Sequence, residues 1–361
     1  MKTRSAWLST VIAVAAVVSL AAPAAAAEQS SAKQVPATNS AQDNSAVDRN
    51  KVKAELDSAM KIIEQHIGAK QEDLNKAVER LLGQPAESTP RLFDCFGDKT
   101  KDGDFRMLCI RVFQKMGVLP PAEFHQNLNR IMRDKKDRPF PRIDAAAMLL
   151  QDEKKLDPST RKEIKQLGFT LYSEESAKDY VATRIFNRFP NDGEVEQFLV
   201  KAAKTESNQS RRDGLLHMLG KRKSNAVVVM VRGELKANNP ERLFSKSRMY
   251  LALGDVGSQD AYNVLVTQLP RERDRTSHSQ ILMAIGVTKN PAAKDLLIGE
   301  LKKPWQVNTW AAVEGLRFLG DPSVTPILEA ELNRDVPAPS YKETVRRAIS
   351  KINTGDDKPF W

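Results

Sequence analysis

The sequence predicts an all-α fold, an α-α superhelix (solenoid) of helical pairs stacked in chain order behind an N-terminal helical hairpin. The first observation is a hydrophobic–Gly pair that recurs at intervals of 34, 32 and 34 residues. The copies are Leu219-Gly220, Leu253-Gly254, Ile285-Gly286 and Leu319-Gly320. Four apolar positions spaced i, i+3, i+4 and i+8 follow each pair, which places one apolar stripe on a helix. Aromatic residues are only 6% of the chain, which favours helices over strands.

The four stripes define the second helix of each pair. They are Val227, Met230, Val231 and Leu235; Ala261, Val264, Leu265 and Leu269; Ala293, Leu296, Leu297 and Leu301; and Val324, Ile327, Leu328 and Leu332. A repeat of this length is typical of stacked helical hairpins. One pair cannot bury its own stripe, so neighbours must stack, and stacking leaves two long surfaces, one of them concave.

Residues 1–27 are predicted to be a cleaved signal peptide. Lys2 and Arg4 give a basic start, residues 6–22 are apolar, and residues 24–27 are all Ala, the small side chains that signal peptidase requires. An uncleaved membrane anchor is the alternative, but the apolar run is short and rich in Ala. The alanine-rich cleavage region looks bacterial, and no Cys for lipid attachment lies near it, so we expect a periplasmic or secreted protein.

Residues 28–50 are rich in Ser, Ala, Gln, Asn and Asp and are predicted to be a disordered tether, because they cannot bury enough apolar surface to fold. Residues 51–140 are predicted to form an N-terminal helical region. Two apolar stripes, Val52 to Ile67 and Leu74 to Leu82, predict its first two helices as a hairpin. A coiled coil is the alternative for the first stripe, which is barely two heptads long.

The two cysteines, Cys95 and Cys109, are predicted to form a disulfide, as expected of a Cys pair in an exported protein. Two buried free thiols are the alternative. Between them, the oxygens of Asp98, Thr100, Asp102 and Asp104, with Gly103 at the turn, resemble the first half of a calcium loop. The twelfth position holds Cys109 where such loops have a bidentate Glu, so we favour an ordinary Asp/Gly-rich turn and predict no metal site.

Residues 141–354 are assigned to the repeats and a C-terminal cap. The stripe recurs at residues 195–203, and a weaker copy lies before this region, at residues 124–132. The last helix, about residues 341–352, would close the stack. Residues 355–361 form a tail ending in Pro359-Phe360-Trp361. This ending either packs back on the cap or serves as a short ligand for a partner.

The fourth copy carries a family resemblance. Residues 307–313 read Val-Asn-Thr-Trp-Ala-Ala-Val, and residues 319–322 read Leu-Gly-Asp-Pro. This resembles a HEAT repeat, more narrowly the short HEAT-like repeats of the phycobiliprotein-lyase type. The similarity covers residues 210–352 and, less closely, residues 105–209. It departs at Asn308, where the family has Arg, and at Lys221 and Val287, where it has Asp. The resemblance implies an α-solenoid that acts as a binding scaffold, and it carries no catalytic residues.

Charge and aromatic residues suggest where a partner would bind. The net charge is +10, and removing residues 1–27 leaves +8. Four basic clusters lie in or near the repeats, and a basic edge would attract an acidic protein, a phospholipid surface or an anionic envelope polymer. They are Arg211-Arg212, Lys221-Arg222-Lys223, Arg271 to Arg275, and Lys302-Lys303. A solvated charged surface is the alternative. Trp305 and Trp310 are candidate anchors, and packing against the neighbouring repeat is their alternative role.

No catalytic constellation is evident. His66, His125, His217 and His278 are far apart in the sequence, and no P-loop, Rossmann fingerprint or Gly-x-Ser-x-Gly elbow occurs. We therefore predict a non-catalytic, exported α-solenoid without cofactor that binds a protein partner as a cell-envelope scaffold or adaptor. Two alternatives remain: a binder of an anionic polymer or membrane surface through basic loops, and a lyase-like enzyme on a HEAT scaffold. Nucleic acid is not expected to be a partner of an exported protein.

Overall fold

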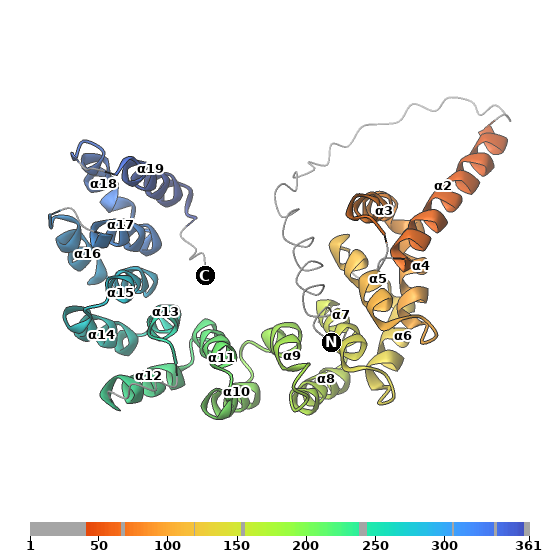
Figure 1. The fold of residues 1–361 in the computed structure, drawn as a ribbon, viewed down its shortest axis with the longest axis horizontal. Helices are drawn as coiled ribbons and strands as arrows, with labels where there is room; N and C mark the ends of the chain where they lie inside the picture. Colours follow the sequence, from red (N-terminus) through yellow and green to blue (C-terminus); the bar gives the residue numbers. More distant parts are fainter. Residues whose placement is uncertain are drawn as a thin grey trace. The chain divides into compact units, whose positions relative to one another are not determined.

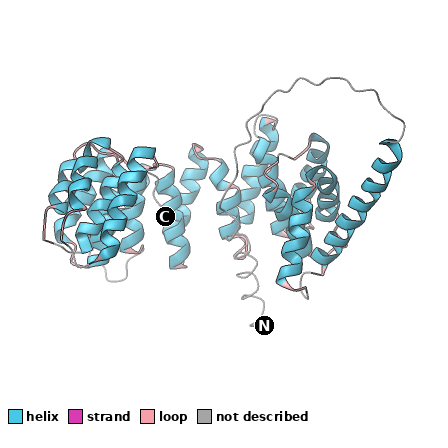
Figure 2. Cartoon of the chain, turned by 90° about the horizontal axis from the view of Figure 1, so that it is seen from above, coloured by secondary structure: helices cyan, strands magenta, loops and turns pink. Residues whose placement is uncertain are grey.

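The computed structural model is all-helical, with the eighteen helices α2 to α19 and no strand within the described residues (Figures 1 and 2). The structure describes residues 41–65, 69–118, 120–152, 156–237, 244–304, 307–335 and 338–356. The predicted signal peptide, the first part of the predicted tether, His66, Trp305 and the end of the tail lie outside these ranges.

The N-terminal half contains α2 (Ala41–Glu64), α3 (Gln71–Gly83), α4 (Pro85–Gly97), α5 (Gly103–Lys115), α6 (Ala122–Arg133), α7 (Pro139–Leu149), α8 (Pro158–Leu171) and α9 (Lys178–Arg184). The C-terminal half contains α10 (Gly193–Thr205), α11 (Gln209–Lys221), α12 (Asn225–Ala237), α13 (Lys246–Val256), α14 (Gln259–Gln268), α15 (Arg275–Val287), α16 (Ala293–Leu301), α17 (Val307–Leu319), α18 (Thr325–Glu331) and α19 (Pro339–Thr354). Short 3-10 turns are η1 (Leu150–Asp152), η2 (Phe186–Arg188), η3 (Leu269–Arg271) and η4 (Pro322–Val324).

The chain divides into two units, Met1–Glu55 and Leu56–Trp361, and the second unit carries every site discussed below. Helix α2 begins at Ala41, so it includes the last ten residues of the segment predicted to be a tether. Extending a helix that has already nucleated costs little free energy, even for polar residues. In the second unit, α2 buries the predicted apolar positions Leu56 and Ile63 together with Ala59.

Helices α4 and α5 are joined covalently. The sulfur atoms of Cys95 and Cys109 are 2.13 Å apart, so the predicted disulfide is confirmed. The turn between the helices uses its aspartates for local hydrogen bonds. Asp98 accepts from the backbone N–H and the hydroxyl of Thr100, and Asp102 accepts from the backbone N–H groups of the first turn of α5. These carboxylates therefore stabilise a turn and cap a helix.

We expect reduction of this disulfide to lower the free energy of unfolding by about 3 kcal/mol, because the cross-link restricts the unfolded chain. Urea unfolding with and without dithiothreitol measures the difference. In the double variant Cys95→Ala/Cys109→Ala, the reductant should have no effect. Equal stability of the oxidised and reduced protein would contradict the prediction.

From α11 onward, the odd-numbered helices stack in sequence. Helix α11 packs on α13, α13 on α15, α15 on α17 and α17 on α19. Helices α12, α14 and α16 each pack on both odd-numbered neighbours, and α18 packs on α19. Figure 1 shows the odd-numbered and even-numbered helices as two rows. The predicted all-α solenoid is therefore confirmed. The first and third stripe positions are buried in every copy, for example Val227 and Val231. Among the second positions, Val264 is buried and Leu296 and Ile327 are half-buried.

The recurring glycines have a role that the sequence did not reveal. The first three lie in the last turns of α11, α13 and α15, where they face the next odd-numbered helix. A Cβ on Gly220 would lie 2.9 Å from the carbonyl oxygen of Ala252, and one on Gly286 only 2.0 Å from that of Gly315. Glycine therefore sets how closely these backbones approach. Only Gly320 follows its helix, with the left-handed φ of 71° that favours glycine there.

Candidate functional site

The stack of helices has two chemically different edges. Ion pairs and hydrogen bonds join equivalent ends of successive odd-numbered helices, so these helices run parallel. At their first turns, the Arg211 Nε donates to Asp179 Oδ2 over 3.2 Å. At their last turns, the Lys221 Nζ lies 2.7 Å from Asp255 Oδ1. The even-numbered helices return the chain between them. One edge therefore consists of loops that lead into odd-numbered helices, and the opposite edge of loops that leave them.

One of these edges, formed by the loops that precede the odd-numbered helices, carries a row of lysines and arginines without ion pairs among the described residues. We call this row the basic edge. These side chains are exposed and have no ion pair or hydrogen bond within the described residues. They come from the last turns of α10 and α12, the first turn of α13, the η3–α15 loop and the end of α16. The basic edge comprises Lys201, Lys204, Lys236, Arg248, Arg271, Arg273, Arg275 and Lys302.

Two carboxylates on the basic edge are buried and already paired with lysines. Glu272 accepts from the Lys246 Nζ over 2.9 Å and from the Tyr250 hydroxyl over 2.8 Å. Burial alone would raise the pKa of Glu272, but these hydrogen bonds outweigh it and hold the pKa below its ordinary value. Glu206 is paired in the same way with the Lys178 Nζ, at 3.0 Å. Because these acids already have cationic partners, they do not neutralise the arginines around them.

The opposite edge is largely neutralised by pairs between repeats. Lys221 and Asp255 form one such pair, and Lys294 lies 3.3 Å from Asp321. Arg222, predicted to bind a partner, has a half-buried guanidinium that donates to the carbonyl oxygens of Phe186 and Phe189. Burial lowers its pKa. Arg222 therefore joins α11 to the preceding turn, and of its basic cluster only Lys223 is exposed and unpaired.

The structure separates two clusters that the sequence grouped together. Arg211 and Arg212 lie at the start of α11, and Lys221 to Lys223 at its other end. Both arginines have partners within the protein. Arg211 pairs with Glu175 and Asp179, and Arg212 donates to the backbone oxygen of Glu206. By contrast, the clusters at Arg271 to Arg275 and at Lys302 do lie on the same edge. The single cations Lys201, Lys204, Lys236 and Arg248 were missed, because isolated basic residues form no cluster in the sequence.

The described surface has little apolar area to offer a partner. Val118 and Val229 are the large apolar side chains that are strongly exposed within the described ranges. Trp310 is partly buried, and its indole N–H donates to the Thr344 hydroxyl of α19 over 2.9 Å. It therefore connects the last repeat to the cap. Contiguous apolar patches often mark stable protein interfaces, so charge is the more distinctive feature of this surface.

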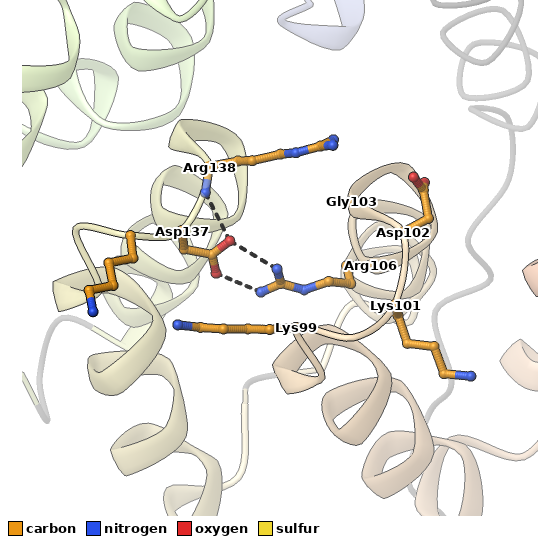
Figure 3. Close-up of a pocket in the computed structure, with 8 residues that line it drawn as sticks. Lys99, Lys101, Asp102, Gly103, Arg106, Asp137 and Arg138 are labelled. Carbon is orange, nitrogen blue, oxygen red and sulfur yellow. Dashed lines mark hydrogen bonds and ion pairs between the residues drawn. The ribbon is translucent and has the colours of Figure 1, made fainter.

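A cavity of about 360 Å³ lies where the turn after α4 meets the link before α7. In Figure 3, Arg106 and Asp137, which both line it, point toward each other, and their closest atoms, Nη2 and Oδ2, are 2.7 Å apart. The Nζ atoms of Lys99 and Lys101 pair with Asp134 and Glu64. Most cations around this cavity therefore have acidic partners, and the cluster joins α5 to α7 more clearly than it forms a binding site for anions.

The histidines within the described residues lie on three separate helices. His125 is on α6, His217 on α11 and His278 on α15. His217 Nδ1 is 3.3 Å from Asp255 Oδ2, and His278 Nδ1 is 3.4 Å from the carbonyl oxygen of Glu272. No group of three or more His, Cys, Asp or Glu side chains suited to a metal occurs in the described ranges. His217 forms no hydrogen bond with Asp255 at this distance, whereas His278 has a carbonyl neighbour that can fix the orientation of its ring.

No protein-family profile and no curated protein matches this chain. Among the residues that the structure describes, no helix combines the length and the apolar character needed to cross a bilayer.

Proposed function

We propose that this chain is an exported, non-catalytic solenoid of the HEAT-repeat kind that binds an acidic protein partner along its basic edge, as a scaffold or adaptor. The observation that carries the proposal is the difference between the two edges. Exposed lysines and arginines that have no partner among the described residues extend from α10 to α16 on one edge, whereas the charges of the other are largely paired.

Unpaired arginines suit this role for a physical reason. The guanidinium group stays charged at any physiological pH and presents several N–H donors in a plane, so it can bind a carboxylate through two parallel hydrogen bonds. Arg271, Arg273 and Arg275 lie within a stretch of five residues that runs from the end of η3 through a short loop to the start of α15. Because they occupy neighbouring exposed positions, an acidic segment that crosses this loop meets several of them at once.

A second candidate is an anionic polymer or membrane surface. The small exposed apolar area supports it, because polyanions bind through charge and need no apolar anchor. Synthetic probes separate the two candidates. An oligoglutamate peptide represents the acidic protein, and polyphosphate and phosphatidylglycerol vesicles represent the polymer and the membrane. Preference for the peptide at matched negative charge supports the protein partner, and preference for either of the others supports the second candidate.

We expect the triple variant Arg271→Glu/Arg273→Glu/Arg275→Glu to bind a fluorescent oligoglutamate peptide at least ten times more weakly than the wild type, a loss of about 1.4 kcal/mol. Fluorescence anisotropy at increasing salt concentration measures the affinities of both proteins. The affinity of the wild type should itself fall as salt is added, because salt screens exposed charges.

The matched control reverses three exposed cations on the opposite edge: Lys162→Glu/Arg188→Glu/Lys223→Glu. This control variant changes the net charge of the protein by the same amount, but it should retain most of the wild-type affinity for the oligoglutamate peptide. If both triple variants lose affinity equally, binding depends on net charge alone and the proposed edge is wrong.

A further inference from the structure

An aromatic pocket lies at the start of the basic edge. It is a cavity of about 410 Å³ near the C-terminal ends of α8 and α10. Phe169 and Tyr172 line it from α8 and the residue that follows, and Phe198 lines it from α10. Lys201 belongs both to this lining and to the basic edge. The pocket is therefore continuous with the surface that we propose for binding.

The rings form one cluster. The centroids of Phe169 and Phe198 are 4.9 Å apart, and those of Tyr172 and Phe198 are 5.2 Å apart with their planes nearly perpendicular. Phe186, fully buried, is within 5.9 Å of all three other rings. Phe169 and Phe198 are only half-buried. Such rings stack well on another aromatic side chain, with centroid distances in the range seen here.

The helices around the pocket are less closely stacked than those that follow. Helix α11 packs extensively on α13, whereas α9 makes few backbone contacts with α11. Side chains therefore line the space between α8 and α10. Where helices stack closely, as at Gly286 and Gly315, no comparable room is left between their backbones.

Polar groups surround the rings. The Tyr172 hydroxyl has no hydrogen-bond partner among the described residues, and burial raises the pKa of this side chain to about 12, so it stays a neutral donor. The Nζ of Lys178 holds Glu206 at 3.0 Å, while Lys201 is exposed and unpaired. An aromatic side chain entering this pocket would therefore find a neutral donor at its wall and a free cation at the rim for an adjoining carboxylate.

We infer that the pocket receives an aromatic side chain of an acidic peptide segment, whose carboxylates lie on the basic edge. The inference rests on the proposed function and narrows its partner class: the partner carries an aromatic anchor beside its acidic residues. Interfaces gain most of their affinity from a few such buried aromatic anchors, whereas charges mainly set orientation and association rate. A polyphosphate chain has no group that fills this pocket.

The test compares two fluorescent oligoglutamate peptides that differ at one position, Trp in one and Ser in the other. We expect the wild-type protein to bind the Trp peptide roughly tenfold more tightly than the Ser peptide. This ratio of affinities corresponds to a difference of about 1.4 kcal/mol in binding free energy. Ala202 of α10 also lines the pocket, so the variant Ala202→Trp places a large side chain in it, and Phe198→Ala removes one wall. Both should reduce the ratio to about one while leaving the affinity for the Ser peptide unchanged.

Val229→Ser is the matched control, because it removes the most exposed large apolar side chain among the described residues, outside the pocket, and should leave the ratio unchanged. Circular dichroism confirms that each variant folds. A wild-type ratio near one, or a preference for Trp that survives both pocket variants, overturns the inference, while salt-dependent binding of both peptides still supports the proposed function. If neither peptide binds, the proposed function is wrong and the inference with it.

Discussion

Replacing Gly286 by Ala should lower the free energy of unfolding by about 3 kcal/mol, at the upper end of the usual cost of overpacking. The new Cβ would lie 2.0 Å from the carbonyl oxygen of Gly315 and 2.8 Å from its Cα. These atoms are backbone, so no side chain can rotate to make room. Helices α15 and α17 would have to move apart. Urea unfolding followed by circular dichroism measures the loss.

The same substitution at Gly299 provides the control. Gly299 is also inside a helix, α16, but a Cβ there would meet nothing within 4 Å. Gly299→Ala should stabilise the protein by about 0.4–1 kcal/mol, because Ala restricts the unfolded chain more than Gly does. If the two variants are equally stable, then α15 and α17 are not in the close contact described.

The helical pairs could be predicted because their signal is local. A stripe at i, i+3, i+4 and i+8 depends only on the geometry of one helix, and the buried positions Val231 and Leu265 follow from it. The role of the glycines is not local. Gly286 is required because Gly315, in the next repeat, lies against it. The sequence pattern of one helix does not determine its register against the next helix, so this contact could not be predicted.

The basic edge could be predicted only in part. Neighbours in the sequence lie at the same end of a helix, so the cluster at Arg271 to Arg275 was visible. Arg211 and Lys221 also looked like members of one group. They stand at opposite ends of α11, whose 13 residues span about 20 Å. The aromatic pocket was not foreseen, because Phe198 comes from a different helix than Phe169 and Tyr172, and its alignment with them depends on tertiary packing.

The second large effect is expected at the ion pair between α5 and the link before α7. The side chains of Arg106 and Asp137 are 4% and 5% exposed, and the Arg106 Nε also donates to the carbonyl oxygen of Phe96 over 2.9 Å. Arg106→Met keeps most of the side-chain volume but leaves the Asp137 carboxylate buried without its partner. We expect a loss of about 3–5 kcal/mol in the free energy of unfolding, as for other broken buried pairs.

An exposed ion pair provides the comparison. Arg346 and Glu343 on α19 form a pair whose side chains are 62% and 76% exposed. Arg346→Met should change the stability by no more than about 0.5 kcal/mol, because water already screens this interaction. Equal losses for the two variants would show that burial does not set the strength of the Arg106–Asp137 pair.

The pH dependence tests the same pair in a second way. Burial tends to raise the pKa of Asp137, but the hydrogen bonds and charge of Arg106 outweigh it and hold the pKa below the ordinary value of 3.8. A carboxylate with a lowered pKa stabilises the folded state above its unfolded pKa, and this contribution disappears as the pH falls through the folded pKa. The wild type should therefore lose stability below about pH 4. In Arg106→Met the pKa of Asp137 rises, because only the Arg138 backbone N–H and the charge of Lys99 then oppose the effect of burial. The stability difference between the two proteins should therefore shrink as the solution is acidified. A difference that stays constant from pH 7 to pH 3 would mean that the two side chains do not interact through charge.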